Sequence, residues 1–192
     1  MPFYPDDAPI PTELRTDEFL LRPLLASDAA LDYAAVMASR DLLHLRSGGS
    51  WPRDGFTLDE NRADLEAHER DFRERAGFTY TIMNPGETEC LGCVYIYPLG
   101  RILARADASP GDGINPDAAE ASFWVRPACV ARDLDRRLFV ALLPWLRGDF
   151  AFSELYFRCF VAEARHAAIF ADAGLRLAYT FPASDTRLLL FE

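Results

Sequence analysis

The sequence predicts an α/β domain in which helices cover both faces of a mixed β-sheet. Three observations support this prediction. The chain has 192 residues, of which 50% are hydrophobic and 12% aromatic, so it can form one substantial core. Segments with the two-residue period of strands alternate with amphipathic helical segments in the C-terminal half. A turn signature, Asn84-Pro85-Gly86-Glu87, joins two apolar strand-like segments into a hairpin.

The predicted elements follow the order strand, two helices, three strands, helix, strand, helix and two strands. The predicted strands cover residues 18–25, 78–83, 89–99, 120–125, 154–163, 175–181 and 186–192. The predicted helices cover residues 28–43, 58–77 and 164–174, together with a long helix that follows Pro127. Strands that are followed by crossover helices indicate a mixed sheet with helices on both faces.

Local signals mark several ends of these elements. Ser27 and Asp28 are expected to cap the first helix, and Thr57 and Glu60 form a capping box for the second. Residues 46–56 and 104–120 are rich in turn-forming residues and are predicted to be loops. Residues 1–16 hold four prolines and are predicted to be an extended arm, which leaves 17–192 as a single domain.

The charge of the chain restricts its partners. The formal net charge is −10, which disfavours duplex nucleic acid and anionic membranes as partners. A polyanionic ligand would need a local basic pocket, and the basic residues are all arginine. The absence of lysine excludes a lysine Schiff-base mechanism. No secretion signal or apolar run of membrane-spanning length is present, so a cytoplasmic location is expected.

Two cysteines form a C-x-x-C pair at Cys90 and Cys93, inside a predicted strand. Residues three apart in a regular strand point to opposite faces, so the two thiols are expected to diverge. We therefore expect two buried small side chains here and no metal site. A metal or redox role would need the pair on a turn with further ligands nearby.

Several stretches together resemble the Gcn5-related N-acetyltransferase (GNAT) family. LLRPLLASDAALDY is similar to its opening strand and helix, and FTYTIMNPGETECLGCVYIYPL resembles its central hairpin, with Gly92 at the expected glycine. AEASFWVRPACVARDLDRRLFVALLPWL resembles the cofactor-binding core, and VAEARHAAIFADAGL resembles the helix that ends at Gly174 and Leu175. The resemblance covers about residues 14–192. It implies a mostly antiparallel central sheet and acetyl transfer from acetyl-coenzyme A to an amine.

The resemblance also implies a set of cofactor-binding positions. These are Phe123, Trp124, Val125, Val130, Ala131, Arg132, Asp133, Leu134, Arg136, Arg137, Glu163 and Phe170. In the family, loop glycines let backbone amides approach the pyrophosphate at a helix N-terminus. Aligned on Pro127, the motif positions here hold Ala128, Ala131 and Asp133. The carboxylate of Asp133 is expected to cap the helix, taking those amides and placing a negative charge beside them.

Three arginines near this loop allow two interpretations. Arg132, Arg136 and Arg137 can pair with Asp133 and Asp135 on a solvated surface. Alternatively, they can clamp phosphates while Asp133 turns aside.

The second helix of the implied site departs from the family pattern as well. The family asparagine position holds Glu163, and the tyrosine that usually protonates the leaving thiolate is replaced by Phe170, which has no proton to donate. Tyr156 or Tyr97 could take that role. His166 lies one helical turn before Phe170, where a surface position or a catalytic role are the alternatives.

The implied mechanism is direct attack of a neutral amine on the thioester, whose carbonyl is polarised by backbone amides near Phe123 to Val125. Glu120 is the candidate general base, and its alternative is a charge at a strand end that faces solvent. Trp51 could form a wall of the acceptor site or a local packing anchor. Asp54, Asp59 and Glu60 would suit a cationic amine.

Three functions remain compatible with the sequence. The first is a GNAT-like N-acetyltransferase that acts on a small-molecule or peptide amine. The second is a catalytically silent GNAT-fold domain that binds another ligand or a protein partner in the inherited cleft. The third is an interaction protein that forms a homodimer through the apolar strands 175–181 and 186–192.

Overall fold

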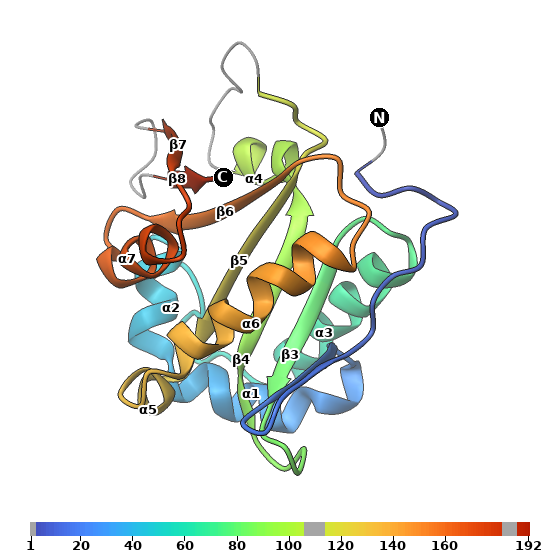
Figure 1. Ribbon diagram of the computed structural model, residues 1–192. Coiled ribbons are helices and arrows are strands. Elements are labelled where there is room, and N and C mark those ends of the chain that lie inside the picture. The colour runs from blue at the N-terminus through green and yellow to red at the C-terminus, as the bar shows by residue number, and fades with distance from the viewer. Residues whose placement is uncertain (1–2, 106–113, 182–187) are drawn as a thin grey trace.

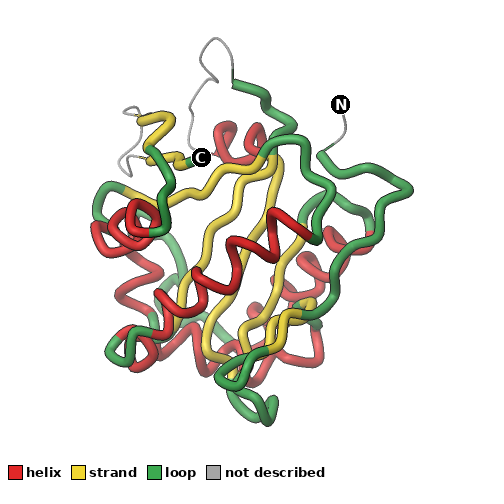
Figure 2. The backbone as a smooth tube through the Cα atoms, in the orientation of Figure 1, coloured by secondary structure: helices red, strands yellow, loops and turns green. Residues whose placement is uncertain are grey.

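The computed structural model describes residues 3–105, 114–181 and 188–192, and its helices lie on both faces of one sheet (Figures 1 and 2). The strands are β1 (Leu14–Arg15), β2 (Leu20–Pro23), β3 (Phe78–Met83), β4 (Cys90–Pro98), β5 (Ala119–Val125), β6 (Leu155–Phe160), β7 (Leu177–Phe181) and β8 (Leu188–Phe191). The helices are η1 (Ala26–Asp28), α1 (Ala29–Ala38), α2 (Arg40–Arg46), α3 (Leu58–Arg73), α4 (Leu99–Arg105), α5 (Pro127–Val130), α6 (Leu134–Gly148) and α7 (Ala164–Asp172).

The sheet has the strand order β1-β2-β3-β4-β5-β6-β8-β7. Neighbouring strands pair antiparallel except β5 and β6, which are parallel and are connected through α5 and α6. The mixed, mostly antiparallel sheet that the sequence predicted is therefore confirmed. Helix α6 crosses one face, and α1, α2 and α3 lie behind the sheet (Figure 1).

Strand alternation divides β5 between the two faces. Ala119, Ala121, Phe123 and Val125 belong to the core cluster under α6, whereas Trp124 belongs to the cluster under α1 and α2. Side chains of β5 therefore point alternately toward the α6 side and toward the α1 and α2 side of the sheet. Because helices cover both faces, all seven residues are buried.

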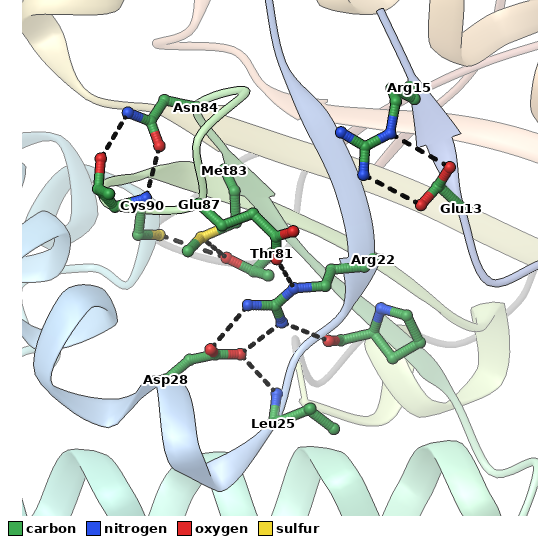
Figure 3. A network of polar contacts seen from close by, with 12 residues as sticks. Glu13, Arg15, Arg22, Leu25, Asp28, Thr81, Met83, Asn84, Glu87 and Cys90 are labelled. Atoms are coloured by element: carbon green, nitrogen blue, oxygen red, sulfur yellow. Dashed lines mark hydrogen bonds and ion pairs between the residues drawn. The ribbon is translucent and has the colours of Figure 1, made fainter.

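The capping box of α3 is confirmed: the Thr57 hydroxyl accepts from the Glu60 amide, and the Glu60 carboxylate accepts from the Thr57 amide. Helix α1 begins directly after its N-cap residue Asp28, as predicted, but the Asp28 side chain makes no cap hydrogen bond to α1. Its carboxylate accepts instead from Arg22 at 2.8 and 2.9 Å and from the Leu25 amide, before η1, at 3.1 Å (Figure 3). The half-buried guanidinium from β2 attracts the Asp28 carboxylate more strongly than an amide of α1 does.

One further detail differs from the sequence prediction. Residues 99–105, partly assigned to a loop, form helix α4, which packs beside β4; the remainder of that loop up to residue 113 lies outside the described residues. The N-terminal arm is docked on the domain. Tyr4 is buried against Phe78, and Tyr80 donates to the Pro11 carbonyl at 2.6 Å.

Candidate active site

The parallel strands β5 and β6 separate partway along their length. Their pairing covers Ala119 to Ala121 against Leu155 to Phe157, and both strands continue beyond it. Figure 1 shows β6 turning away from β5 at this point, with α7 near the open end. Beyond Ala121 the two backbones no longer pair, and we call this separation of the strands at Phe123 the opening; on its α6 side the Phe123 side chain is buried in the core.

A cavity of about 530 Å³ lies on the opposite face and reaches this opening, since Arg46, Trp124, Arg158 and Phe160 line it. Its remaining wall comes from α1, α3, α4 and the loop after α2. Acidic, aromatic and imidazole groups contribute to the lining, namely Asp32, Asp64, Asp71, Trp51, Tyr95, Tyr97 and His68. The lining combines apolar and aromatic side chains with many charged and polar ones, so the cavity has both walls and convergent polar groups for a small polar ligand.

Trp51 lies on the cavity wall and is also a local packing anchor. It packs edge-to-face on Phe56 with ring centroids 5.7 Å apart. The Trp51 side chain also hydrogen-bonds Asp64, whose pKa is raised by burial despite that bond. The acids that we proposed for a cationic amine lie elsewhere: Asp54 pairs with Arg40, and Glu60 serves the α3 cap.

Glu120 is fully buried, so the interpretation of a solvent-facing strand end is wrong. Its Oε1 accepts from Arg158 Nε at 2.6 Å, and Arg158 also donates to the Ser122 hydroxyl at 2.8 Å. The Arg158 side chain, rather than the Glu120 carboxylate, is the member of this pair that lines the cavity. Arg158 therefore lies between the cavity and Glu120, so a proton from a molecule in the cavity would have to pass Arg158 to reach the Glu120 carboxylate.

His68 and Tyr97 form a polar pair on the cavity wall, where the sequence gave no sign of their contact. His68 Nδ1 lies 2.8 Å from the Tyr97 hydroxyl, and the Thr79 hydroxyl lies 3.1 and 3.2 Å from these two atoms. Arg101 stacks over the Tyr97 ring at 4.3 Å and pairs with Asp71 at 2.8 Å. The residues come from α3, β3, β4 and α4, and the pairing depends on how these elements pack.

The opening between β5 and β6 is bridged by a buried ion pair. Arg46 Nη1 lies 2.6 Å from Glu163 Oε1 and donates to the Phe123 carbonyl at 2.7 Å. The two side chains are 9% and 2% exposed. The Glu163 Oε2 atom accepts from the Phe160 amide, so this carboxylate joins α2, β5 and the β6–α7 turn.

Phe170 lies in the core under α6, where its ring packs edge-to-face near that of Phe123, and it does not line the cavity. It is fully buried, with its ring centroid 4.7 Å from that of Phe139 and 5.3 Å from that of Phe191. Tyr156, one of the two substitutes proposed as a proton donor, has a pKa raised to about 12 by burial and sits outside the cavity lining. Tyr97 is the substitute that lines the cavity.

The turn before α6 carries Asp133 in the left-handed conformation, with φ 59°. This is the conformation that glycine adopts most easily, which fits the glycine position of the family motif. The amides of Ala131, Arg132 and Asp133 donate to the carbonyls of Pro127, Cys129 and Val130. Backbone groups within the turn therefore already satisfy these three donors.

Asp133 does not cap α6, contrary to our expectation, because its carboxylate makes no cap hydrogen bond. It accepts instead from Arg165 Nη2 at 2.6 Å, and the same guanidinium binds Asp135 at 2.5 and 2.8 Å. Asp135 is buried, and Arg165 keeps its pKa below the ordinary value against the opposing effect of burial. Arg165 of α7 is thus the partner that sequence spacing missed.

The three arginines of the proposed clamp follow neither interpretation in full. Arg136 pairs with Asp172 at 2.6 Å, and Arg137 forms a two-bond pair with Glu18 at 2.6 and 2.9 Å. Arg132 contacts the Cys129 sulfur at 3.8 Å. Arg136 and Arg137 are paired with carboxylates, as the surface interpretation required, but the partners come from other elements. Of the other candidate positions, Val125 and Leu134 are buried and Val130 packs against the core.

His166 is 8% exposed and stacks near Phe123 with ring centroids 4.7 Å apart, so a helix-surface position is wrong. Burial lowers its pKa to about 4, with the Arg46 charge acting in the same direction and Glu163 opposing them. The His166 imidazole therefore stays neutral in the folded protein over a pH range in which it is protonated in the unfolded chain.

We predict that stability falls on acidification through this histidine. Between the unfolded pKa of about 6.5 and the folded value of about 4, the unfolded state binds more protons. The contribution of His166 to the free energy of unfolding is fully present above pH 6.5 and falls by about 3 kcal/mol as the pH decreases to 4. Denaturant unfolding at several pH values measures this loss, which His166→Phe should largely remove. An unchanged pH dependence in that variant would contradict a neutral, buried His166.

None of the helices among the described residues is long and apolar enough to cross a membrane. No protein-family model matches the sequence, and no curated protein matches it in sequence. Solved structures match over nearly the whole chain. A ribosomal-protein-S5-alanine acetyltransferase from Vibrio fischeri is 12% identical, with a TM-score of 0.70 over 94% of this chain and 95% of that chain.

Two further structures match over similar lengths. A ribosomal L7/L12 α-N-protein acetyltransferase in complex with coenzyme A is 14% identical, with a TM-score of 0.67 over 92% of this chain and 93% of that chain. A GNAT-family acetyltransferase from Bacillus anthracis is 10% identical, with a TM-score of 0.65 over 94% and 96%. At these identities the likeness concerns the backbone. The chain therefore has the fold of the GNAT acetyltransferases.

Proposed function

We propose that this protein is a cytoplasmic N-acetyltransferase that moves an acetyl group from acetyl-coenzyme A to an amine of a small molecule or peptide. The observation that carries the proposal is the separation of β5 from β6 beside a cavity of about 530 Å³. At this separation, a thioester bound on one face of the sheet would contact an amine bound on the other face. The ribosomal-protein acetyltransferases among the matching structures make a peptide N-terminus an acceptor to test first.

The cofactor would run along β5 at Phe123 to Val125 and place its phosphates at the turn before α6. Arg136 and Arg137 would exchange their carboxylate partners for phosphate. Both arginine side chains are more than two-fifths exposed, and exposed ion pairs contribute roughly 0–1 kcal/mol each. That small loss is readily offset by charge-assisted hydrogen bonds to a pyrophosphate.

The acceptor would enter the cavity as a cation and react as a neutral amine. Asp64 lines the cavity and would attract an ammonium group, while Trp51 and Tyr95 supply aromatic walls. Because Glu120 is held behind Arg158, we assign removal of the proton to His68, with Tyr97 as the group that returns a proton to the leaving thiolate. Both lie on the cavity wall, and histidine is the side chain that most often acts as a general base.

A steady-state assay of thiol release tests this function with acetyl-coenzyme A and a panel of small amines and short peptides. Loss of a general base typically costs 10²–10⁴-fold, so His68→Gln should lower kcat by about that factor with little change in KM. His44→Gln is the matched control, because His44 binds the Pro52 carbonyl outside the cavity lining. Activity that survives His68→Gln and disappears in Glu120→Gln would return the role of base to Glu120.

The alternative is a silent GNAT-fold domain, and two observations favour it. The Arg46–Glu163 pair bridges the opening at the Phe123 carbonyl, while Asp133 presents a carboxylate at the turn that would hold phosphate. Binding of acetyl-coenzyme A would have to displace the Arg46–Glu163 ion pair, and its phosphates would have to lie beside the Asp133 carboxylate.

Asp133→Gly tests the effect of that carboxylate. A unit charge about 4 Å from a phosphate oxygen costs about 1 kcal/mol in water, so removal should tighten coenzyme A binding ~5-fold. The glycine also adopts the left-handed backbone without strain. Calorimetric titration measures the change, and Asp133→Asn separates charge from backbone. An affinity that stays the same in both variants would refute repulsion at this position.

A further inference from the structure

Three potential metal ligands converge beside the cavity, and the acetyl-transfer proposal gives none of these three residues a role. Asp32 of α1 and Cys90 and Cys93 of β4 each place a ligand atom within 4.8 Å of the other two. Cys93 Sγ lies 3.5 Å from Asp32 Oδ1. The three residues are 4%, 1% and 1% exposed.

The two thiols share one face of the sheet, so the divergence that we predicted is wrong. In the β3–β4 ladder Ile82 pairs with Gly92 and Met83 pairs with Cys90, which leaves Leu91 as an extra residue. Leu91 packs in the core under α6, whereas Cys90 and Cys93 both pack in the cluster under α1. This β-bulge changes the alternation between the two cysteines and brings their sulfur atoms together.

The carboxylate of Asp32 has no cationic partner among the residues that the structure describes. Its neighbours are Asn61 Nδ2, which donates to Oδ2 at 2.9 Å, and the Cys93 thiol. A buried carboxylate without a counter-charge is costly. A cation at this position would remove that cost.

The sulfur atoms lie among polar and sulfur-containing side chains of the same cluster. Around Cys90, the Thr81 hydroxyl donates to the sulfur at 3.5 Å and to Met83 Sδ at 3.3 Å (Figure 3). The Cys93 thiol donates to Asp32 Oδ1. A divalent ion would hold both sulfur atoms as thiolates, because metal ligation deprotonates a thiol.

We propose that Asp32, Cys90 and Cys93 bind one divalent ion of the zinc class. Two thiolates and one carboxylate oxygen are three of the four ligands of a tetrahedral zinc site. Asp32 and Asn61 also line the cavity, which gives the ion a route of entry and its fourth position a source of water. Binding releases one proton from each thiol to solvent, and a third from Asp32 where the carboxyl is protonated. Asn61 orients the carboxylate through the oxygen that does not face Cys93.

Cobalt titration of the full-length, chelator-treated and reduced protein tests this proposal. We expect one equivalent of Co²⁺ to produce the near-ultraviolet band of thiolate-bound cobalt, and Zn²⁺ to remove the band by displacement. Cys90→Ser and Cys93→Ser should each lose the band. Cys159→Ser is the matched control, because Cys159 is equally buried in β6, away from the cluster, and this variant should retain it.

Asp32→Asn provides a second test if the cysteine variants do not fold. In the metal-free protein this variant should melt at a higher temperature than the wild type, because it removes an uncompensated buried charge. Zn²⁺ at 100 times its dissociation constant should raise the Tm of the wild type by about 5 °C or more, and that of Asp32→Asn by much less.

The proposal is overturned if the wild type gives no cobalt band, if the band survives both cysteine substitutions, or if Cys159→Ser loses it. It is also overturned if Asp32→Asn keeps the full zinc-induced rise in Tm. None of these outcomes depends on acetyl transfer, since the titrations contain neither acetyl-coenzyme A nor an amine.

Discussion

Arg46→Met is expected to destabilise the protein by about 3–5 kcal/mol. The substitution leaves the Glu163 carboxylate in a position where it is 2% exposed, without the guanidinium 2.6 Å away. It also removes the donor to the Phe123 carbonyl. An unpaired buried charge costs far more than the hydrophobic replacement regains, so the loss should appear as a lower midpoint in urea or guanidinium unfolding.

A double-mutant cycle separates the ion pair from other effects of the substitution. Glu163→Gln keeps an acceptor for the Phe160 amide and removes the charge. We expect Arg46→Met combined with Glu163→Gln to regain most of the stability lost in Arg46→Met, since no buried charge is left without a partner. Additive losses in the double variant would show that Arg46 and Glu163 are not energetically coupled.

Gly92→Ala is expected to cost about 3 kcal/mol or more, or to prevent folding. A Cβ atom at this position would lie 2.0 Å from the Trp124 carbonyl oxygen and 2.8 Å from the Val125 Cα. Both atoms belong to the backbone of β5, so no side-chain rotation can relieve the contact. The φ of 155° adds strain for any residue with a side chain.

Gly86→Ala is the control for Gly92→Ala. It lies in the turn of the same hairpin, and a Cβ there would meet nothing within 4 Å. Circular dichroism and denaturant unfolding should therefore show a near-native Gly86→Ala protein and a strongly destabilised Gly92→Ala protein. A Gly92→Ala variant within 0.5 kcal/mol of the wild type would contradict the close approach of β4 to β5.

Features that depend on residues close in sequence were predictable. The capping box at Thr57 and Glu60 connects positions three apart, and the β3–β4 hairpin follows from its turn residues. Gly92 was recognised from the motif, and the structure supplies its physical reason in the approach of Trp124. In each case the determining contact is local or is encoded in a short pattern.

Features that depend on long-range packing were missed. Arg46 and Glu163 are 117 positions apart, and Arg165 reaches Asp133 across 32 positions. No periodicity connects such residues. The bulge at Leu91 changes the face of one cysteine, so the prediction from regular strand alternation was wrong. His166 is buried because the packing around Phe123 and α7 encloses it, and helix periodicity alone does not specify that.

The central claim is that the opening between β5 and β6 accepts acetyl-coenzyme A despite the Arg46–Glu163 pair and Asp133. Thermal unfolding of the metal-free protein with and without millimolar acetyl-coenzyme A tests it most directly. Ligand at 100 times its dissociation constant adds about 2.7 kcal/mol of stability, which for a domain of this size raises Tm by roughly 5–11 °C. We predict a rise of that size. No shift at millimolar ligand would contradict the claim and favour the silent domain.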